Sequence, residues 1–300
     1  LNYLDTQERH SATVGSLNAS VSSRAHRHNE QNSDSFFVLS SKALADRLKP
    51  QLELMSDTLQ AARFDEVSRI RDLVSQMRAR RDQGITGSGH ALAMTAACAG
   101  MSPLAKRGHE QGGLEGIRTL RALDDVLKND GELEALAHLL GAIHQKLAGA
   151  GAPLLCTVAD DPNIQSASEA SAQRAGALPT TSHDGIALDP VRIGIQEMWV
   201  TNTQVNFCAK AYPTVPSGHP DAPALSVLAA FLRNGFLHRT IREQGGAYGG
   251  GASHDPNIAA FRFFSYRDPR LVETLDDFDA SIAWLLETQH EQLALEEAIL

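Results

Sequence analysis

The residues best suited to chemistry in this sequence lie in one short stretch, IREQGGAYGGGA, at residues 241–252. Arg242 stands near the end of a run of helix-forming residues, two glycines follow, and Tyr248 comes six residues after the arginine. Arginine is permanently cationic, and a tyrosine hydroxyl is a neutral hydrogen-bond donor near pH 7. If the two side chains meet, they form a pair of donors for an oxygen atom that gains negative charge during a reaction.

The glycines between these two residues provide the geometry for such a meeting. Gly245 and Gly246 can take positive φ values, which would end the helix in a left-handed cap and reverse the chain sharply. This reversal would bring Arg242 and Tyr248 together, and we predict that both bind a substrate oxygen. The alternative is structural, with Arg242 paired to a carboxylate of its own helix and Tyr248 packed on a sheet.

The same glycines do not form a phosphate-binding loop. A Walker loop continues with Lys-Ser or Lys-Thr after its last glycine, whereas Ala252, Ser253 and His254 stand here. A dinucleotide loop precedes a helix and uses the positive N-terminal end of that helix, whereas these glycines follow a helix. Their order and spacing therefore exclude nucleotide binding at this stretch.

Other catalytic motifs are missing from the sequence. The twelve histidines include no H-E-x-x-H or H-x-x-E-H pattern, so we predict no metal site in this chain. No G-x-S-x-G sequence marks a nucleophilic serine, and we interpret Ser88 and His90 of GSGH as a tight loop at a helix start. The few, widely spaced cysteines favour a reducing compartment, which is the cytoplasm or an organelle matrix, and the cytoplasm in a bacterium. They are Cys98, Cys156 and Cys208.

Length and composition describe a globular protein with two domains. Three hundred residues are long for one core, and 42% hydrophobic with 21% charged residues is ordinary for a folded chain. A net charge of -9 argues against nucleic acid as a partner. No apolar run reaches the roughly 18 residues of a membrane span, so no membrane partner is expected either. The chain begins at Leu1 and ends within a helical pattern, so we expect a piece of a longer polypeptide.

The elements that must position Arg242 and Tyr248 form two blocks of strands and helices. In the first block, residues 12–23 and 34–44 alternate between apolar and polar side chains, which predicts antiparallel strands joined by a polar linker. The remaining elements predicted for this block are helices at 48–82 (broken near 63–66), 85–103, 112–127 and 131–151, a strand at 152–161, and a helix rich in serine and alanine after it.

The second block begins after the turn-rich residues 176–190, where we place the boundary between domains 1–180 and 181–300. Its predicted elements are one or two strands at 191–215, a helix at 219–246, a hairpin at 247–269 and a helix at 271–289. Because strands and helices recur in both blocks, we predict an α+β fold of two related domains. Each would have an antiparallel sheet covered on one face by helices.

Four stretches of the sequence resemble the pitrilysin/insulinase family of zinc metallopeptidases, and its presequence-protease branch in particular. They are LHRTIREQGGAYGGGA, FRFFSYRDPRLVETLDDF, ITGSGHALAMTAA and GGLEGIRTLRAL. The resemblance implies the fold of the pitrilysin and processing-peptidase metallohydrolases, which have four related domains in two halves. Residues 1–180 would be the third of these domains and residues 181–300 the fourth, each of them truncated.

The resemblance also implies a division of labour between the two halves. In that family the N-terminal half holds zinc with an inverted H-x-x-E-H motif, and the C-terminal half supplies an arginine and a tyrosine. Those two residues bind the scissile carbonyl and stabilise the tetrahedral intermediate, and they correspond to Arg242 and Tyr248. The expected whole protein is a zinc endopeptidase that degrades unstructured peptides, with its zinc held by the N-terminal half of the same polypeptide. This chain lacks the zinc motif and is expected to be inactive alone.

Two alternatives stay open from the sequence. The chain could be a naturally separate, non-catalytic subunit or scaffold that pairs with a zinc-bearing subunit, as some members of the family do. It could also be an independent enzyme of another class, which the lack of a self-contained catalytic set disfavours. The coding sequence before Leu1 separates half a peptidase, with an upstream H-x-x-E-H in frame, from a separate subunit with its own start codon.

Overall fold

A computed structural model describes residues 2–149, 153–178 and 187–300. By their contacts in space, the described residues divide into two compact units. The first takes its members from 1–22, 35–76 and 123–186, and the second from 23–34, 77–122 and 187–300. Several elements contribute to both units, so the units are not consecutive halves of the sequence. The predicted domain boundary at 180/181 lies outside the described residues and stays a prediction.

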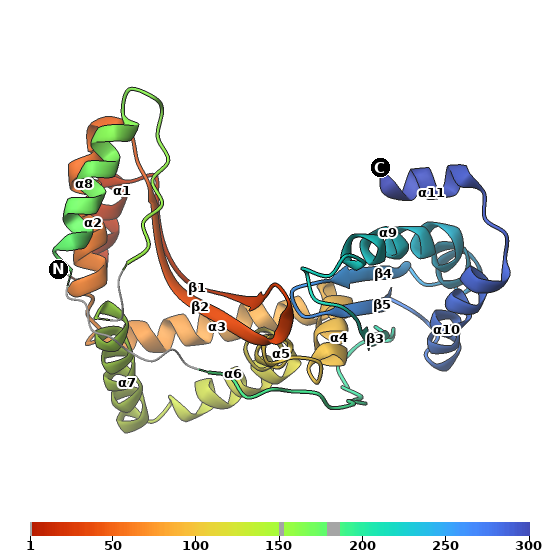
Figure 1. Ribbon diagram of the computed structural model, residues 1–300. Helices are drawn as coiled ribbons and strands as arrows, with labels where there is room; N and C mark the ends of the chain where they lie inside the picture. Colours follow the sequence, from red (N-terminus) through yellow and green to blue (C-terminus); the bar gives the residue numbers. More distant parts are fainter. Residues whose placement is uncertain (1, 150–152, 179–186) are drawn as a thin grey trace. The chain divides into compact units, whose positions relative to one another are not determined.

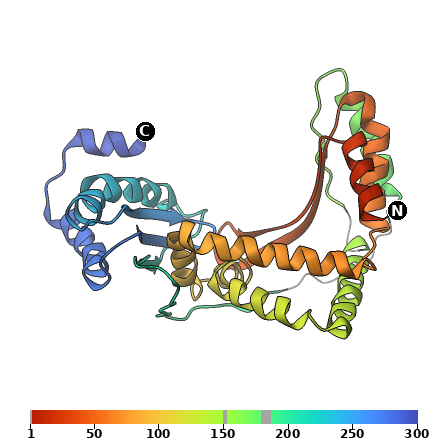
Figure 2. The same cartoon turned by 180° about the vertical axis from the view of Figure 1, so that it is seen from behind.

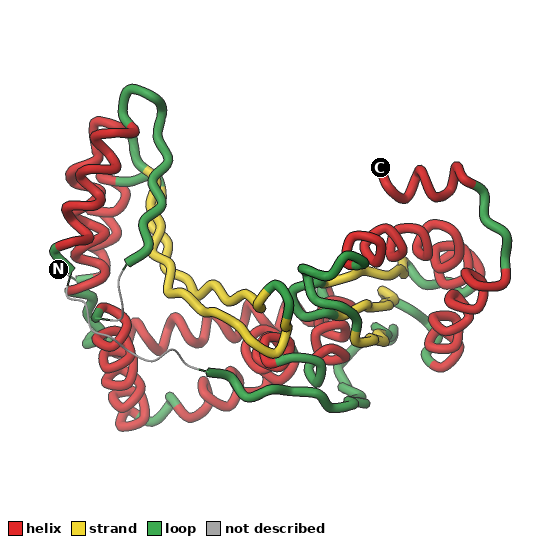
Figure 3. Tube along the Cα trace, in the orientation of Figure 1, coloured by secondary structure: helices red, strands yellow, loops and turns green. Residues whose placement is uncertain are grey.

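A hairpin of two strands occupies the early part of the chain (Figure 3). Its strands are β1 (Ser16–His26) and β2 (Asn29–Lys42). The alternating pattern predicted both strands, but the linker is only two residues long because most of its polar residues continue the strands. Two-residue turns match the twist of paired strands, which favours this short connection.

Helices form most of the rest of the chain before residue 178. The break predicted near residues 63–66 is confirmed, since it separates α2 from α3. The helices are α1 (Tyr3–Thr13), η1 (Ala45–Arg47), α2 (Leu48–Gln60), α3 (Val67–Gly87), α4 (Gly89–Cys98), α5 (Pro103–Gly112), α6 (Leu114–Val126), α7 (Asp130–Ala148) and α8 (Ile164–Gly176).

Two predicted strand regions are wrong in part. Residues 153–161 join no sheet, and Leu154 and Val158 are 88% and 90% exposed. In the region predicted at 191–215, only β3 (Ala209–Pro213) forms as a strand. Apolar runs become strands only where a partner strand and a core surface are available, and these segments find neither.

The second unit contains the sheet that carries the Arg–Tyr stretch. It is a three-stranded antiparallel sheet with the strand order β3-β5-β4. The predicted hairpin is confirmed as β4 (Gly249–Asp255) and β5 (Ala260–Tyr266). The helices that follow β3 and β5 are α9 (Ala222–Leu232), η2 (Arg233–Gln244), α10 (Val272–Glu287) and α11 (Gln292–Ile299).

Alternate side chains of β5 serve two different faces of this sheet. Phe261 and Phe263 are buried in a core with residues of α9, η2 and α10, including Phe278. Figures 1 and 2 show α9 running beside β4 from both sides. On the opposite face, Phe264 and Tyr266 contact His90 of α4. The predicted α+β class is confirmed, and helices pack on both faces of this sheet.

The helix that leads into the glycines changes its geometry halfway. α9 is an α-helix, whereas η2 is a π-helix, in which hydrogen bonds span five residues. At its end, the Gly246 N–H donates to the Arg242 carbonyl (3.1 Å) and the Ala247 N–H donates to the Ile241 carbonyl (3.1 Å). These bonds resemble a Schellman closure in which each span is one residue longer. The sequence pattern predicted one helix and gave no sign of this wider turn.

The two glycines of the turn are required for different reasons. Gly246 has φ +80°, the left-handed conformation, whereas Gly245 has φ −83°. Gly245 provides space instead, because a Cβ atom there would lie 2.0 Å from Nη2 of Arg270. Arg270 in turn pairs with Asp277 of α10 at 2.9 Å. The turn is therefore packed against the segment that leads into α10.

We predict that Gly246→Ala lowers the free energy of unfolding by about 1–2 kcal/mol, because a Cβ atom in the left-handed conformation crowds the backbone carbonyl. Gly249→Ala is the matched control, since a Cβ atom there meets nothing within 4 Å and φ is not positive. Urea unfolding followed by circular dichroism should place the control at or above the unsubstituted midpoint. Equal midpoints for the two variants would contradict the assigned turn.

Candidate functional site

The wide turn brings Arg242 and Tyr248 together. The guanidinium carbon of Arg242 lies 5.9 Å from the centroid of the Tyr248 ring, within the range of a cation–π contact. Both side chains are exposed, and Tyr248 keeps 67% of its surface accessible. Within the described ranges, no carboxylate forms an ion pair with Arg242. The pair is thus available to a ligand, which the structural alternative for the arginine does not explain.

The backbone of Tyr248 is fixed at the point where the turn enters the sheet. Its N–H donates to the carbonyl of Tyr266 at 3.1 Å and approaches the carbonyl of Arg267 at 3.4 Å. The Tyr248 ring meets the Tyr266 ring edge-on, with 5.6 Å between the ring centroids. The tyrosine therefore stands on a held backbone and against a rigid aromatic neighbour, while its own ring stays accessible.

Tyr266 is the central aromatic residue of the site, and the sequence reasoning missed its role. Its ring lies 4.9 Å from His90 and 5.7 Å from Phe207, measured between ring centroids. The signal that could have found it is the alternation along β5, which places Tyr266 on the same face as Phe264. Ser88 and His90 form no hydrogen bond with each other among the described residues, in agreement with their interpretation as a loop.

His90 is held as a neutral ring among these aromatics. Burial lowers the pKa of His90 from its usual value of 6.5, because desolvation disfavours the charged ring. Its Nδ1 atom is buried and has no hydrogen-bond partner in the part of the chain that the structure describes. A proton added to His90 would therefore place an unpaired charge behind Tyr266.

A cavity of about 360 Å³ lies next to this aromatic cluster. It shares Phe207 with the cluster, and Arg267 at its edge places its guanidinium carbon 5.5 Å from the Tyr266 ring centroid. The remaining lining residues are polar or aliphatic, namely Thr86, Asn202, Thr203, Gln204 and Val205.

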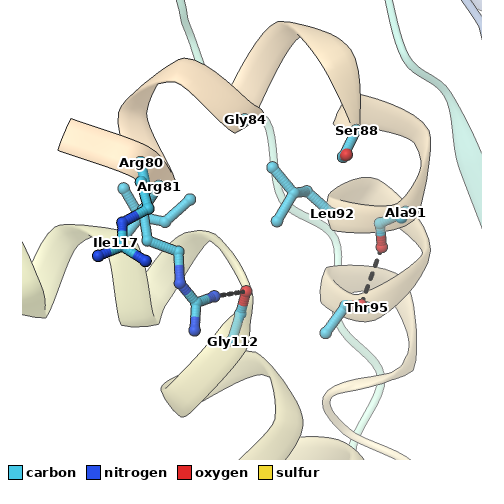
Figure 4. A pocket seen from close by; sticks show the side chains of 9 residues that line it. All are labelled: Arg80, Arg81, Gly84, Ser88, Ala91, Leu92, Thr95, Gly112 and Ile117. Atoms are coloured by element: carbon cyan, nitrogen blue, oxygen red, sulfur yellow. Dashed lines mark hydrogen bonds between the residues drawn. The ribbon is translucent and has the colours of Figure 1, made fainter. Parts of the chain in front are cut away.

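A separate cavity of about 300 Å³ is lined by residues of α3, α4 and the α5–α6 region (Figure 4). Arg81 donates to the Gly112 carbonyl at 2.9 Å, and the Thr95 hydroxyl donates to the Ala91 carbonyl at 2.8 Å. Two of its polar side chains thus serve the local fold. The cavity contains none of the residues that the sequence motif singled out, and we assign it no chemistry.

The described residues contain no group of three or more His, Cys, Asp or Glu side chains that could hold a metal ion. The part of the chain on view thus does not fit the zinc that the family resemblance implies. None of the helices in the described ranges combines the length and the hydrophobicity that a membrane crossing requires.

Two family models match the chain in succession. Residues 1–123 match the family of domains associated with the M16 peptidases of subfamily C, and residues 196–300 match the PreP C-terminal domain. The second match contains both Arg242 and Tyr248.

Curated presequence proteases are similar to this chain over most of its length. Presequence protease 1, chloroplastic/mitochondrial, of Arabidopsis thaliana is 28% identical over 264 residues, which cover 88% of this chain and 24% of that protein. The mitochondrial presequence protease of Drosophila melanogaster is 30% identical over 258 residues, 84% of this chain and 24% of that protein. That of Yarrowia lipolytica is 26% identical over 302 residues, 95% of this chain and 29% of that protein. The chain therefore spans less than a third of the length of these relatives.

The environment of His90 predicts a pH dependence of stability. Because its pKa is lowered in the folded state, the unfolded chain binds the proton more tightly, so the stabilisation is complete above pH 6.5 and is lost as the pH falls below that value. We expect His90→Phe to reduce the drop in urea midpoint between pH 7.5 and pH 5.5. An unchanged drop would show that His90 is not buried as described, and His238→Phe at an exposed position serves as the control.

Proposed function

Because this chain belongs to the presequence proteases of the M16 peptidase family and corresponds to their C-terminal region, we propose that it supplies the carbonyl-binding side of a peptidase active site. The observation that carries the proposal is the convergence of Arg242 and Tyr248, both exposed, on one rigid turn. The whole polypeptide would hydrolyse peptide bonds of unstructured peptides.

Peptide hydrolysis passes through a tetrahedral intermediate in which the former carbonyl oxygen carries negative charge. Arg242 would contribute a fixed positive charge and N–H donors, and Tyr248 would contribute one O–H donor. Donors that are already in place when the charge develops stabilise the transition state more than the bound substrate. In comparable sites one such donor contributes roughly 3 kcal/mol.

The surroundings of the pair support this role. The Tyr248 ring can restrain the Arg242 guanidinium, because aromatic faces attract cations at the observed separation. The Tyr248 backbone is fixed by the sheet, and its ring rests on Tyr266. Little motion would then be needed to present both donors to one oxygen atom, which is the condition for electrostatic preorganisation.

Zinc is the metal that the family implies for the whole enzyme. We assign its ligands to another part of the polypeptide, the N-terminal half, since the described residues offer no set that fits it. When bound there, zinc would supply an activated water molecule. The residues of this chain have a different task, which is to bind and orient the substrate carbonyl.

Substrate and location follow from the relatives. The names of those proteins refer to presequences and to mitochondria or chloroplasts. We propose targeting peptides and other unstructured peptides as substrates here, in an organelle matrix or, in a bacterium, the cytoplasm. The N-terminal zinc-bearing half of the same polypeptide is the proposed partner, and neither nucleic acid nor a membrane is proposed as one.

In the whole, zinc-loaded polypeptide, we expect Tyr248→Phe to lower kcat roughly 10²-fold, the scale of losing one oxyanion donor. KM should change little, because the hydroxyl acts mainly in the transition state. Steady-state kinetics with a fluorogenic peptide measure both constants. Tyr212→Phe serves as the control, since its hydroxyl donates to Asp279 on the surface. An unchanged kcat in Tyr248→Phe would show that the phenol is structural.

The chain by itself should not hydrolyse the same peptide. The physical reason is that it contains the carbonyl-binding residues without a source of activated water. Elemental analysis should confirm that the preparation is metal-free before the assay. Hydrolysis by this metal-free chain would overturn the division of the active site, whereas activity restored by the separately produced zinc-bearing half would support it.

A further inference from the structure

Arg267 stands one residue beyond the strand that supports Tyr248, in an unusual backbone conformation. Its φ is +50°, which is uncommon for a residue with a side chain. The turn around it is held from both sides, since Asn206 and Asp268 exchange two backbone hydrogen bonds of 2.7 and 2.9 Å. Outliers of this kind cluster where a side chain must be presented in a set direction.

The guanidinium of Arg267 is free of acidic partners. No ion pair to Arg267 occurs within the ranges that the structure describes, and its side chain is exposed. The adjacent carboxylate of Asp268 is fully buried and is occupied elsewhere, where it accepts from the Arg270 N–H (2.9 Å) and the Thr274 hydroxyl (2.8 Å). Arg267 instead lies over the Tyr266 ring, which leaves its N–H groups available.

The cavity beside Arg267 is lined by neutral polar groups and by no acid. Asn202 and Gln204 carry amide donors, and Thr86 and Thr203 carry hydroxyl groups. The Thr203 hydroxyl accepts from the Val205 N–H at 3.4 Å, so its own proton remains available for a further bond. A volume of about 360 Å³ is sufficient for one side chain or one chain end. The chemical class that fits one arginine and several neutral donors is a carboxylate.

We propose that this cavity binds a carboxylate of the peptide substrate, with Arg267 as the specificity-determining residue. The proposal rests on the proposed peptidase function, because it takes the substrate to lie on Arg242 and Tyr248. From the Tyr248 ring, the Arg267 guanidinium is two contacts away, each shorter than 6 Å. An extended peptide covers that path in about three residues. The carboxylate can belong to an acidic side chain at that distance from the cleaved bond or to the C-terminus of a short peptide.

Two matched peptide pairs distinguish these sources in the whole, zinc-loaded polypeptide. The first pair has both ends blocked and carries Asp or Asn three residues from the cleaved bond. The second pair carries Asn there and ends beside it in a free carboxylate or an amide. We expect a preference of about tenfold in kcat/KM, chiefly through KM, for the acidic member of at least one pair, the scale of a charged hydrogen bond at an accessible site.

Arg267→Gln should abolish this preference, and Arg267→Lys should keep part of it, since lysine retains the charge without the planar fork. Arg174→Gln removes the same charge from α8, which contributes no residue to the site or the cavity, and should leave the preference intact. No preference in either pair, or a preference that survives Arg267→Gln or disappears equally in Arg174→Gln, would overturn the proposal. If Tyr248→Phe leaves kcat unchanged, the proposed function itself fails. If Tyr248→Phe lowers kcat while Arg267→Gln changes nothing, only the carboxylate site fails.

Discussion

The hydrogen bond from the Ala247 N–H to the Ile241 carbonyl is the constraint on which the site depends. It closes the last turn of a π-helix one residue wider than an ordinary helix end would close. The width of that turn sets how far Arg242 on the helix stands from Tyr248 at the start of the sheet. It also explains the local composition, since the left-handed residue and the crowded residue of the turn are both glycines.

Strand β5 joins the stability of the second unit to its chemistry. One face of the strand buries Phe261 and Phe263 against helices, where Phe278 stacks on Phe263 at 5.5 Å. The other face presents Tyr266 to the candidate site. Because both sets of side chains alternate along one strand, a shift of register by one residue would exchange them. The core therefore holds the aromatic support of the site in place, and π-helices are indeed found often at functional sites.

The sequence was sufficient for the motif and for most of the elements around it. Arg242 and Tyr248 were found because their types and their glycine-rich spacing have chemical meaning, and the hairpin and the α+β class followed from periodicity. The strand at 153–161 failed because an apolar run does not reveal whether a partner strand exists. The π-helix, Tyr266 and Arg267 escaped because their roles arise from the hydrogen-bond span, from the opposite side of a sheet and from one unusual φ. None of these leaves a signature in residue types alone.

The central claim is that Arg242 and Tyr248 bind an oxygen that becomes negative, rather than the uncharged substrate. The most direct test compares two inhibitors of the whole, zinc-loaded polypeptide, a phosphinic peptide that mimics the tetrahedral intermediate and the corresponding uncleavable ketomethylene peptide. Isothermal titration should show that Tyr248→Phe raises the Kd of the phosphinic peptide roughly 10²-fold and changes the Kd of the ketomethylene peptide much less. Equal changes for the two ligands, or no change for either, would contradict the account.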